Sequence, residues 1–336
     1  MIMWQIVYHP TTGNFEEIST DLSPLNGSFI RIRPDYIGVC GSDKSILSGK
    51  RKVYDGLILG HEITGIVSEG KGLDMAGDHL SEGDRVVVFP NYYCGECEDC
   101  RHGNYNTCRN KISIGVNAQG ALQEFFDLNP KFTIRVDKQI DPELAPLIEP
   151  MAVAVHAIMK FTDKHRRMIV IGGGSVGISS YVTAKCLGFD DVRIIEKVGI
   201  KREELEKHVG DVYQNIDDSL GVSTDPINIL DTVGSMETIN DIEKLSGVIA
   251  SGSEVVVSGL ESQEYSMHQA YFVRREITFR GSIIYTPRDF VIARDIVSRE
   301  ASLLKKTLTL ADIHTMIEDL KNRILNSTDI KLILKI

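Results

Sequence analysis

The chain has 336 residues, of which 42% are hydrophobic and 25% are charged, so it has the composition of a folded protein long enough for two domains. Its 47 acidic and 37 basic residues give a formal net charge of −10, which argues against an overall basic surface for nucleic acid. We expect no membrane association and a cytoplasmic location, because no apolar run reaches the ~20 residues of a membrane span and no signal-peptide pattern is present.

The first 140 residues predict a β-rich region. Short apolar runs are separated there by clusters of Gly, Pro, Asn and Asp, which is typical of strands joined by turns. The predicted strands are 29–33, 63–68, 85–89, 121–128 and 132–136.

From about residue 150 the pattern changes to alternating strands and helices. An apolar strand at 168–171, a helix at 176–187 and a second strand at 192–195 predict a parallel βαβ unit. The alternation continues with a helix at 201–209, a strand at 227–230, a helix at 236–246 and a strand at 254–257. This order predicts an α/β fold with a doubly wound parallel sheet. Beyond it we expect helices at 290–297 and 310–322 and an apolar tail at 330–336.

A glycine fingerprint follows the first of these strands. Gly172, Gly174 and Gly177 occupy the defining positions of G-x-G-x-x-G, with Ser175 and Val176 between them. The glycines allow a tight turn, close approach of a pyrophosphate and close packing of helix on strand, while the helix N-terminus offers free N–H groups to phosphates. We therefore predict a dinucleotide site; the alternative is a glycine-rich turn without a ligand.

An acidic residue stands where a dinucleotide-binding unit needs one. Glu196 closes the second strand 19 residues after Gly177, and its carboxylate is expected to bind the adenosine ribose hydroxyls and to repel a 2′-phosphate. Lys201 could reach the same ribose, or it could be an ordinary solvated lysine. The prediction is NAD rather than NADP.

Four of the six cysteines lie within 15 positions. Cys94, Cys97, Cys100 and Cys108 are surrounded by glycines and polar residues that cannot build an apolar core. Four thiolates can close a tetrahedron around zinc, which gives a structural site with no open position. Unligated surface thiols at this spacing would be prone to oxidation.

A second candidate metal site is more dispersed. Cys40, His61, Glu62 and Glu149 offer a thiolate, an imidazole and carboxylates, which together can form an open zinc site that polarises an alcohol oxygen. Each residue alone also has an ordinary structural explanation, as a small core residue, a hydrogen-bonded histidine or an acid in a first helical turn. Their presence beside the other two motifs favours the metal site.

The order of these motifs resembles the zinc-dependent medium-chain dehydrogenase/reductase family along essentially the whole chain. The resemblance implies a GroES-like β-rich catalytic domain at 1–148 and 285–336, with a structural zinc lobe at 90–110. It also implies a Rossmann domain at 149–284, an active site in the cleft between the two domains, two Zn²⁺ and one NAD per chain, and a homodimer or homotetramer.

The resemblance also implies roles for individual residues. Cys40, His61 and Glu149 match the catalytic zinc ligands, with Glu62 as an alternate ligand. Ser42 matches the hydroxyl that takes the substrate proton, and Asp43 matches the acid that orients the zinc histidine. Tyr285 matches a substrate-lining tyrosine, although a core tyrosine would give the same sequence.

Two departures from the family pattern narrow the branch. Glu149 replaces the cysteine of many alcohol dehydrogenases and resembles the polyol, sorbitol and threonine dehydrogenase branch. Ser45 replaces a histidine that ends the proton relay in many members, so the exit path of the proton is left open.

The leading hypothesis is a zinc-dependent oxidoreductase that transfers a hydride from a secondary alcohol of a polyol, sugar or cyclitol, with or without a phosphate, to NAD. The alternatives are an L-threonine dehydrogenase or an alcohol/aldehyde reductase on the same scaffold and, in another class, a non-catalytic zinc-lobe interaction module. Lys44 and the run Lys50–Lys52 could hold an anionic group of the substrate or form a solvated turn.

Overall fold

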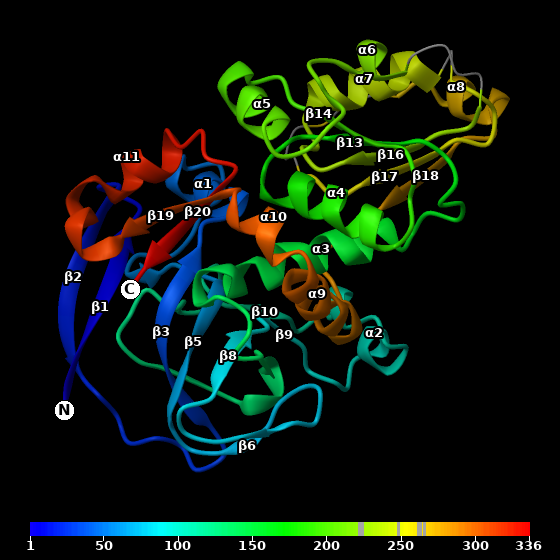
Figure 1. The fold of residues 1–336 in the computed structure, drawn as a ribbon. Helices are drawn as coiled ribbons and strands as arrows, with labels where there is room; N and C mark the ends of the chain where they lie inside the picture. The colour runs from blue at the N-terminus through cyan, green and yellow to red at the C-terminus, as the bar shows by residue number, and fades with distance from the viewer. Residues whose placement is uncertain (221–224, 247–248, 261–263, 265–266) are drawn as a thin grey trace. The chain divides into compact units, whose positions relative to one another are not determined.

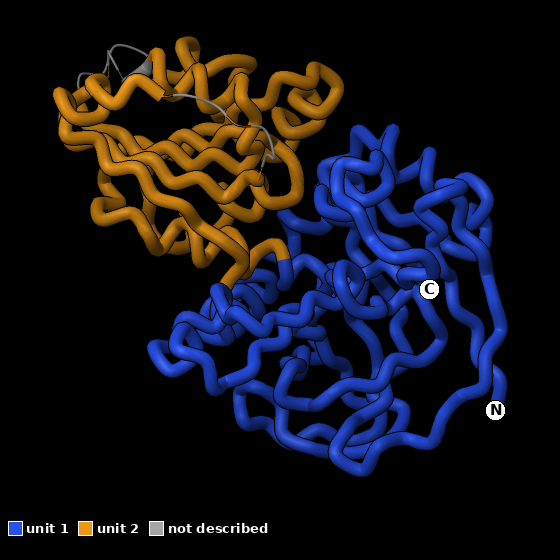
Figure 2. The backbone as a smooth tube through the Cα atoms, turned by 180° about the vertical axis from the view of Figure 1, so that it is seen from behind, with its two compact units in different colours: residues 1–149, 286–336 blue, residues 150–285 orange. Residues whose placement is uncertain are grey.

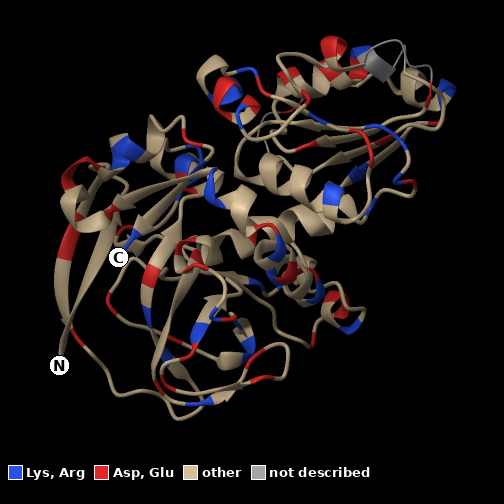
Figure 3. Cartoon of the chain, viewed as in Figure 1, with Lys and Arg blue, Asp and Glu red and all other residues tan. Residues whose placement is uncertain are grey.

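The computed structural model describes residues 1–220, 225–246, 249–260, 264 and 267–336, and it divides into two compact units. Unit 1 is Met1–Glu149 with Thr286–Ile336, and unit 2 is Pro150–Tyr285 (Figure 2). The boundaries expected from the sequence differ from these by one residue each. Acidic and basic residues are interspersed along the chain in both units (Figure 3). Within the described residues, no helix is both long and apolar enough to cross a bilayer.

Unit 1 is built on a seven-stranded sheet in which β3, β5 and β8 lie side by side (Figure 1). The strand order is β12 (Thr133–Arg135), β8 (Arg85–Val88), β5 (Glu62–Glu69), β3 (Ile30–Gly38), β20 (Lys331–Lys335) and β19 (Leu308–Asp312), with β11 (Phe126–Leu128) on β3. Ile32, Ile63 and Val86 are fully buried in its core. Gly65 allows the close pairing of β3 and β5, since a side chain there would overlap the carbonyl of Arg33.

Smaller elements complete unit 1. A second sheet joins β2 (Asn14–Asp21), β1 (Ile2–His9) and β4 (Leu57–Ile58), and short pairs join β6 (Gly72–Leu73) to β7 (His79–Leu80) and β9 (Asn91–Tyr92) to β10 (Ile112–Ser113). The helices of this unit are α1 (Gly41–Leu47), α2 (Glu98–Arg101), α9 (Pro287–Arg299), α10 (Ala301–Lys305) and α11 (Leu320–Leu325), with 3₁₀ turns at Tyr105–Thr107, Pro130–Phe132 and Pro142–Leu147.

The predicted helix at 310–322 is wrong. Leu310 lies in β19, which pairs in parallel with β20 along its whole length. The side chain of Asp312 then accepts a hydrogen bond from the N–H of His314 and starts a new 3₁₀ turn, so helical structure begins only after the strand. The apolar spacing that suggested one helix belongs to two 3₁₀ turns, Ile313–Thr315 and Ile317–Asp319, followed by α11.

Unit 2 confirms the predicted doubly wound sheet. Six parallel strands follow the order β15 (Val212–Tyr213), β14 (Val192–Ile195), β13 (Met168–Ile171), β16 (Asn228–Asp231), β17 (Glu254–Val257) and β18 (Thr278–Gly281). The helices are α3 (Ile148–Ile158), which begins at the unit boundary, α4 (Ser175–Cys186), α5 (Gly199–Glu206), α6 (Ile216–Leu220), α7 (Met236–Ser246) and α8 (Gln269–Arg274).

The alternation of side chains along β13 explains why this strand is apolar throughout. Ile169 and Ile171 pack into the hydrophobic cluster on one face of the sheet, whereas Met168 and Val170 pack into the cluster on the other face. All four residues are buried, as expected for a central parallel strand covered by helices on both sides.

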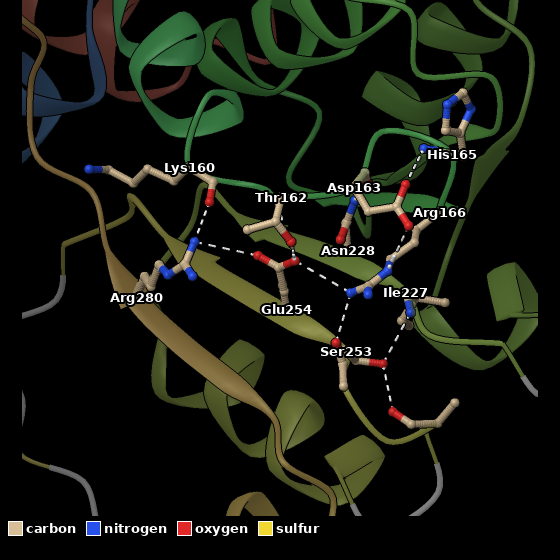
Figure 4. Close-up of polar contacts among 12 residues, drawn as sticks. Lys160, Thr162, Asp163, His165, Arg166, Ile227, Asn228, Ser253, Glu254 and Arg280 are labelled. Atoms are coloured by element: carbon tan, nitrogen blue, oxygen red, sulfur yellow. Dashed lines mark hydrogen bonds and ion pairs between the residues drawn. The ribbon is translucent and has the colours of Figure 1, made fainter.

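A buried carboxylate ties the segment before β13 to the sheet (Figure 4). Glu254, at the start of β17, is only 4% exposed and accepts hydrogen bonds from Thr162, Arg166 and Arg280. Arg166 also donates to the carbonyl of Gly252 at 2.7 Å. Because the strands are parallel, this network lies at their amino ends, opposite the carboxyl ends where α/β sheets bind ligands. It is therefore a structural anchor of unit 2.

Candidate metal centres and dinucleotide site

The pairing of β3 with β5 brings the first metal-binding candidates together. Gly38 at the end of β3 pairs with Glu62 at the start of β5, and Cys40 follows as the residue that caps α1. The ligand atoms of Cys40, His61 and Glu62 consequently lie within 4.8 Å of one another. Cys40 and His61, 21 positions apart in the chain, thus converge with Glu62 on one small site.

Asp43 holds this site from the first turn of α1. Its Oδ2 accepts a hydrogen bond from the N–H of Cys40 at 2.8 Å, and its Oδ1 lies 3.7 Å from Nδ1 of His61. Ser42 Oγ lies 3.4 Å from the other ring nitrogen, Nε2. The carboxylate of Asp43 and the hydroxyl of Ser42 therefore contact the two different ring nitrogens of the imidazole.

The electrostatics of the site suit a cation. Burial raises the pKa of Asp43. Burial also lowers the pKa of His61, but Asp43, Cys40 and Glu149 outweigh that effect and raise it well above its usual value. Among the described residues, His61 Nδ1, Asp43 Oδ1 and Glu62 Oε1 are buried without a hydrogen-bond partner. A thiol, an imidazole and carboxylates around buried, unsatisfied polar atoms fit zinc.

Glu149 lies near this cluster, in the first turn of α3, and is 6% exposed. Its charge acts on the imidazole of His61. Its oxygens do not belong to the group of ligand atoms within 4.8 Å, so its role as a zinc ligand stays a prediction.

The structure adds Lys331, which the sequence analysis missed. This residue of β20 is fully buried, forms an ion pair with Glu62 Oε2 and donates a hydrogen bond to the carbonyl of Val39 at 3.1 Å. The side chain of Glu62 crosses the backbone at Gly38, where any Cβ would overlap it. Glu62 is thus held on one oxygen, Oε2, by Lys331, while its other oxygen, Oε1, is buried without a hydrogen-bond partner.

The four-cysteine lobe forms a second cluster. Sγ of Cys94 lies 4.0 Å from that of Cys100 and 3.6 Å from that of Cys108, and Cys97 and Cys108 are 3.9 Å apart. Four sulfurs bound to one zinc at ~2.3 Å lie about 3.8 Å apart, whereas a disulfide needs ~2.05 Å. The spacing therefore fits a tetrahedral zinc site and not a disulfide.

Backbone groups of the lobe already favour thiolates. N–H groups of Glu96 and Cys97 lower the pKa of the Cys94 thiol to about 6. Burial instead raises the pKa of Cys100 to about 12, a penalty that a divalent cation bound by the four sulfurs would offset.

The glycine fingerprint has the geometry that dinucleotide binding needs. Gly172 adopts φ +98°, which only glycine tolerates well, and a Cβ at Gly177 would overlap the carbonyl of Gly172. Nothing lies within 4 Å of a Cβ built at Gly174, so the turn is open where a pyrophosphate approaches. Ser175 and Val176 begin the 12-residue helix α4, and the N-cap residue before it, Gly174, provides no side-chain cap.

Glu196 lies directly against this turn. One of its oxygens accepts a hydrogen bond from the N–H of Gly173 at 3.0 Å and the other accepts one from Val198 at 2.8 Å. The carboxylate is therefore held beside the fingerprint by the backbone itself. Lys201 lies half-exposed in the first turn of α5. Tyr285 is fully buried, and its role in lining the substrate stays a prediction.

Comparisons with known proteins agree with both units. The family described as "Alcohol dehydrogenase GroES-like domain" matches residues 28–138, which carry Cys40, His61, Glu62 and the four-cysteine lobe. L-galactonate-5-dehydrogenase of Escherichia coli K12 is 29% identical over 277 residues, covering 79% of this chain and 78% of that protein. L-threonine 3-dehydrogenase of Streptomyces avermitilis is 29% identical over 258 residues, 73% of each chain.

Solved structures show the same fold. The crystal structure of galactitol-1-phosphate dehydrogenase from Escherichia coli superimposes with a TM-score of 0.85 and 22% identity, covering 99% of this chain and 100% of that one. These similarities support the resemblance to the medium-chain dehydrogenase/reductase family that the motifs indicate. The predicted fold class, a GroES-like β-rich domain with a Rossmann domain, is confirmed.

Proposed function

We propose that the chain is a zinc-dependent dehydrogenase that transfers a hydride from a secondary alcohol of a polyol or sugar derivative to NAD. The observation that carries this proposal is the convergence of Cys40, His61 and Glu62 at one site on a chain that also bears the open glycine turn and Glu196. Zinc held by Cys40 and His61 with a carboxylate of Glu62 or Glu149 would act as a Lewis acid on the alcohol oxygen.

The residues of unit 1 supply the other parts of this proposal. Ser42, within 3.4 Å of His61, takes the proton of the alcohol, and Asp43 fixes the imidazole through its 3.7 Å approach to Nδ1. Glu62, paired with Lys331 through Oε2, keeps its buried Oε1 available as a ligand. These roles follow the family pattern that the residues match and are supported by the contacts described above.

Substrate oxidation tests the proposal directly. We expect the pure, zinc-loaded enzyme to reduce NAD, followed by absorbance of NADH, with at least one member of a panel of polyols, aldoses, inositols, sugar acids and sugar phosphates. L-threonine and aldehyde reduction belong in the same panel, because a relative is named L-threonine 3-dehydrogenase. Turnover of L-threonine alone would replace the sugar proposal, and one zinc per chain with no nicotinamide binding would favour an interaction module.

Cofactor preference is expected to follow Glu196. Its buried carboxylate beside Gly173 would meet the 2′-phosphate of NADP as an unpaired like charge, so we expect kcat/KM for NAD to exceed that for NADP about 100-fold, or about 2.7 kcal/mol. Glu196→Gln keeps a hydrogen-bond acceptor for the backbone N–H groups but removes the negative charge. It should lower the ratio of kcat/KM for NAD to kcat/KM for NADP at least tenfold. Glu203→Gln, exposed on α5, is the matched control. Equal efficiency with NADP in the unaltered enzyme would contradict the assignment.

We also infer that the enzyme is a homo-oligomer. The strand β18 lies at the edge of the unit 2 sheet, and Phe279 on it and Tyr271 and Val273 on α8 are exposed apolar side chains. An exposed apolar edge favours pairing with a second copy. The molar mass measured by light scattering tests this inference. The cytoplasmic location also stays a prediction.

A further inference from the structure

Unit 1 carries a group of basic residues beside the segments that hold the metal-binding candidates. Lys50, Arg51 and Lys52 lie exposed in the loop after α1, and Lys111 lies half-buried just before β10. Burial and the charge of Arg51 both lower the pKa of Lys111, so the two cations are close enough to interact although 60 positions separate them in the chain. Folding therefore brings like charges together at this place.

These cations lack the carboxylate partners that other basic residues of the protein have. Within the described part of the chain, no acidic side chain forms an ion pair with Lys50, Arg51, Lys52 or Lys111. The ammonium group of Lys111 donates a hydrogen bond to the backbone carbonyl of Asn106, at 3.1 Å. By contrast, Arg109 on the same lobe contacts both Glu98 and Asp99. On a chain of net charge −10, two adjacent unpaired cations mark a local field that favours an anion.

The backbone connects both cations to the metal cluster. The N–H of Arg51 donates to the carbonyl of Ser45 at 2.9 Å, and Ser45 lies on α1, the helix that Cys40 caps. Seven helical residues span about 10 Å.

The segment that follows Lys111 connects it to the metal-binding candidates through the backbone. Gly115 packs so closely on the backbone of Gly60 that a Cβ on Gly115 would lie 2.9 Å from the carbonyl oxygen of Gly60, which immediately precedes His61. The four residues from Lys111 to Gly115 span at most about 13 Å. Arg51 and Lys111 are therefore each attached to a segment that leads to a metal-binding candidate. The distances along these segments, about 10 and 13 Å, are ones that a sugar chain together with a long basic side chain can span.

We propose that Arg51 and Lys111 form a subsite for a carboxylate or phosphate group of the substrate, so that the enzyme oxidises a sugar acid or a sugar phosphate rather than a neutral polyol. This proposal rests on the proposed function. Guanidinium and ammonium groups bind both anions through charge-assisted hydrogen bonds. The names of two similar proteins, L-galactonate-5-dehydrogenase and galactitol-1-phosphate dehydrogenase, designate one substrate of each kind.

Kinetics with matched substrates test the subsite. L-galactonate, galactitol 1-phosphate and neutral galactitol are compared in the holoenzyme and in Arg51→Ala, Lys111→Met and the control Lys71→Ala, which lies exposed on unit 1. We expect the better anionic substrate to exceed galactitol in kcat/KM. Arg51→Ala and Lys111→Met should each raise the KM of the anionic substrate at least tenfold and leave turnover of galactitol unchanged. The control Lys71→Ala should leave the kinetics of both substrates unchanged.

Calorimetry separates this proposal from the proposed function. Binding of L-galactonate, galactitol 1-phosphate and inorganic phosphate is measured in the same variants and in Cys40→Ser, which should bind anions without oxidising them. Loss of anion binding in Arg51→Ala and Lys111→Met supports the subsite even if no sugar is oxidised. Binding that is equal in all variants, or galactitol performing as well as the anionic substrates, would show that the loop is only a solvated turn.

Discussion

Replacing Lys331 by methionine is expected to lower the free energy of unfolding of unit 1 by about 3–5 kcal/mol. The ammonium group is fully buried, and its removal leaves the carboxylate of Glu62, also fully buried, without its opposite charge. Denaturant titration followed by fluorescence measures this effect in unit 1, because the single tryptophan of the chain, Trp4, lies on β1 and packs against its core.

Three further variants separate the charge effect from a loss of packing. Lys331→Arg keeps the charge and should cost less than Lys331→Met, whereas Lys335→Met, on the exposed end of the same strand, should have little effect. Combining Lys331→Met with Glu62→Gln removes both charges and should recover most of the lost stability. A cost below about 1 kcal/mol for Lys331→Met, or no recovery in the double variant, would contradict a tightly coupled buried pair.

The second large effect concerns the two cysteine sites. Cys40→Ser should lower kcat/KM at least a thousandfold, or about 4 kcal/mol, because it removes a ligand from the open site while the fold remains. Cys97→Ser should instead lower the melting temperature and leave activity in the protein that stays folded, because a closed site contributes to folding and not to chemistry. Each variant should contain one zinc per chain by elemental analysis, against two in the unaltered enzyme.

Cys186→Ser is the matched control for both substitutions. Cys186 lies on α4, away from either cluster in sequence and outside both groups of metal-binding side chains. It should retain two zinc ions and full activity. Fewer than two zinc ions in the unaltered enzyme, or substantial activity in Cys40→Ser, would show that a site is wrongly assigned.

The sequence predicts the parts of the site whose residues are close neighbours in the chain. The glycine turn, His61 with Glu62 and the four cysteines each carry a spacing imposed by a ligand, so their chemistry is visible without a fold. Lys331 carries no such pattern. It is one of two lysines in an apolar tail, and only the pairing of β20 with β3 places it against Glu62, 269 positions away.

The same distinction explains the error at 310–322. Periodicity over a few apolar residues cannot distinguish one helix from a strand followed by short turns when the strand is defined by a partner elsewhere. Leu310 has that partner in β20. By contrast, β13 is recognisable because burial on both faces makes every one of its side chains apolar.

The placement of β20 between β3 and β19 has a consequence for synthesis of the protein. Lys331 donates to Val39, 292 positions earlier in the chain. A ribosome adding 5–20 residues per second needs about 15–60 s to cover that distance. In the main sheet of unit 1, the Tyr36–Gly38 end of β3 therefore stays unpaired and Glu62 stays without its cation, while residues 150–285 are already available to form unit 2. Nascent chains in this interval present an exposed strand edge, the kind of surface that chaperones protect from aggregation.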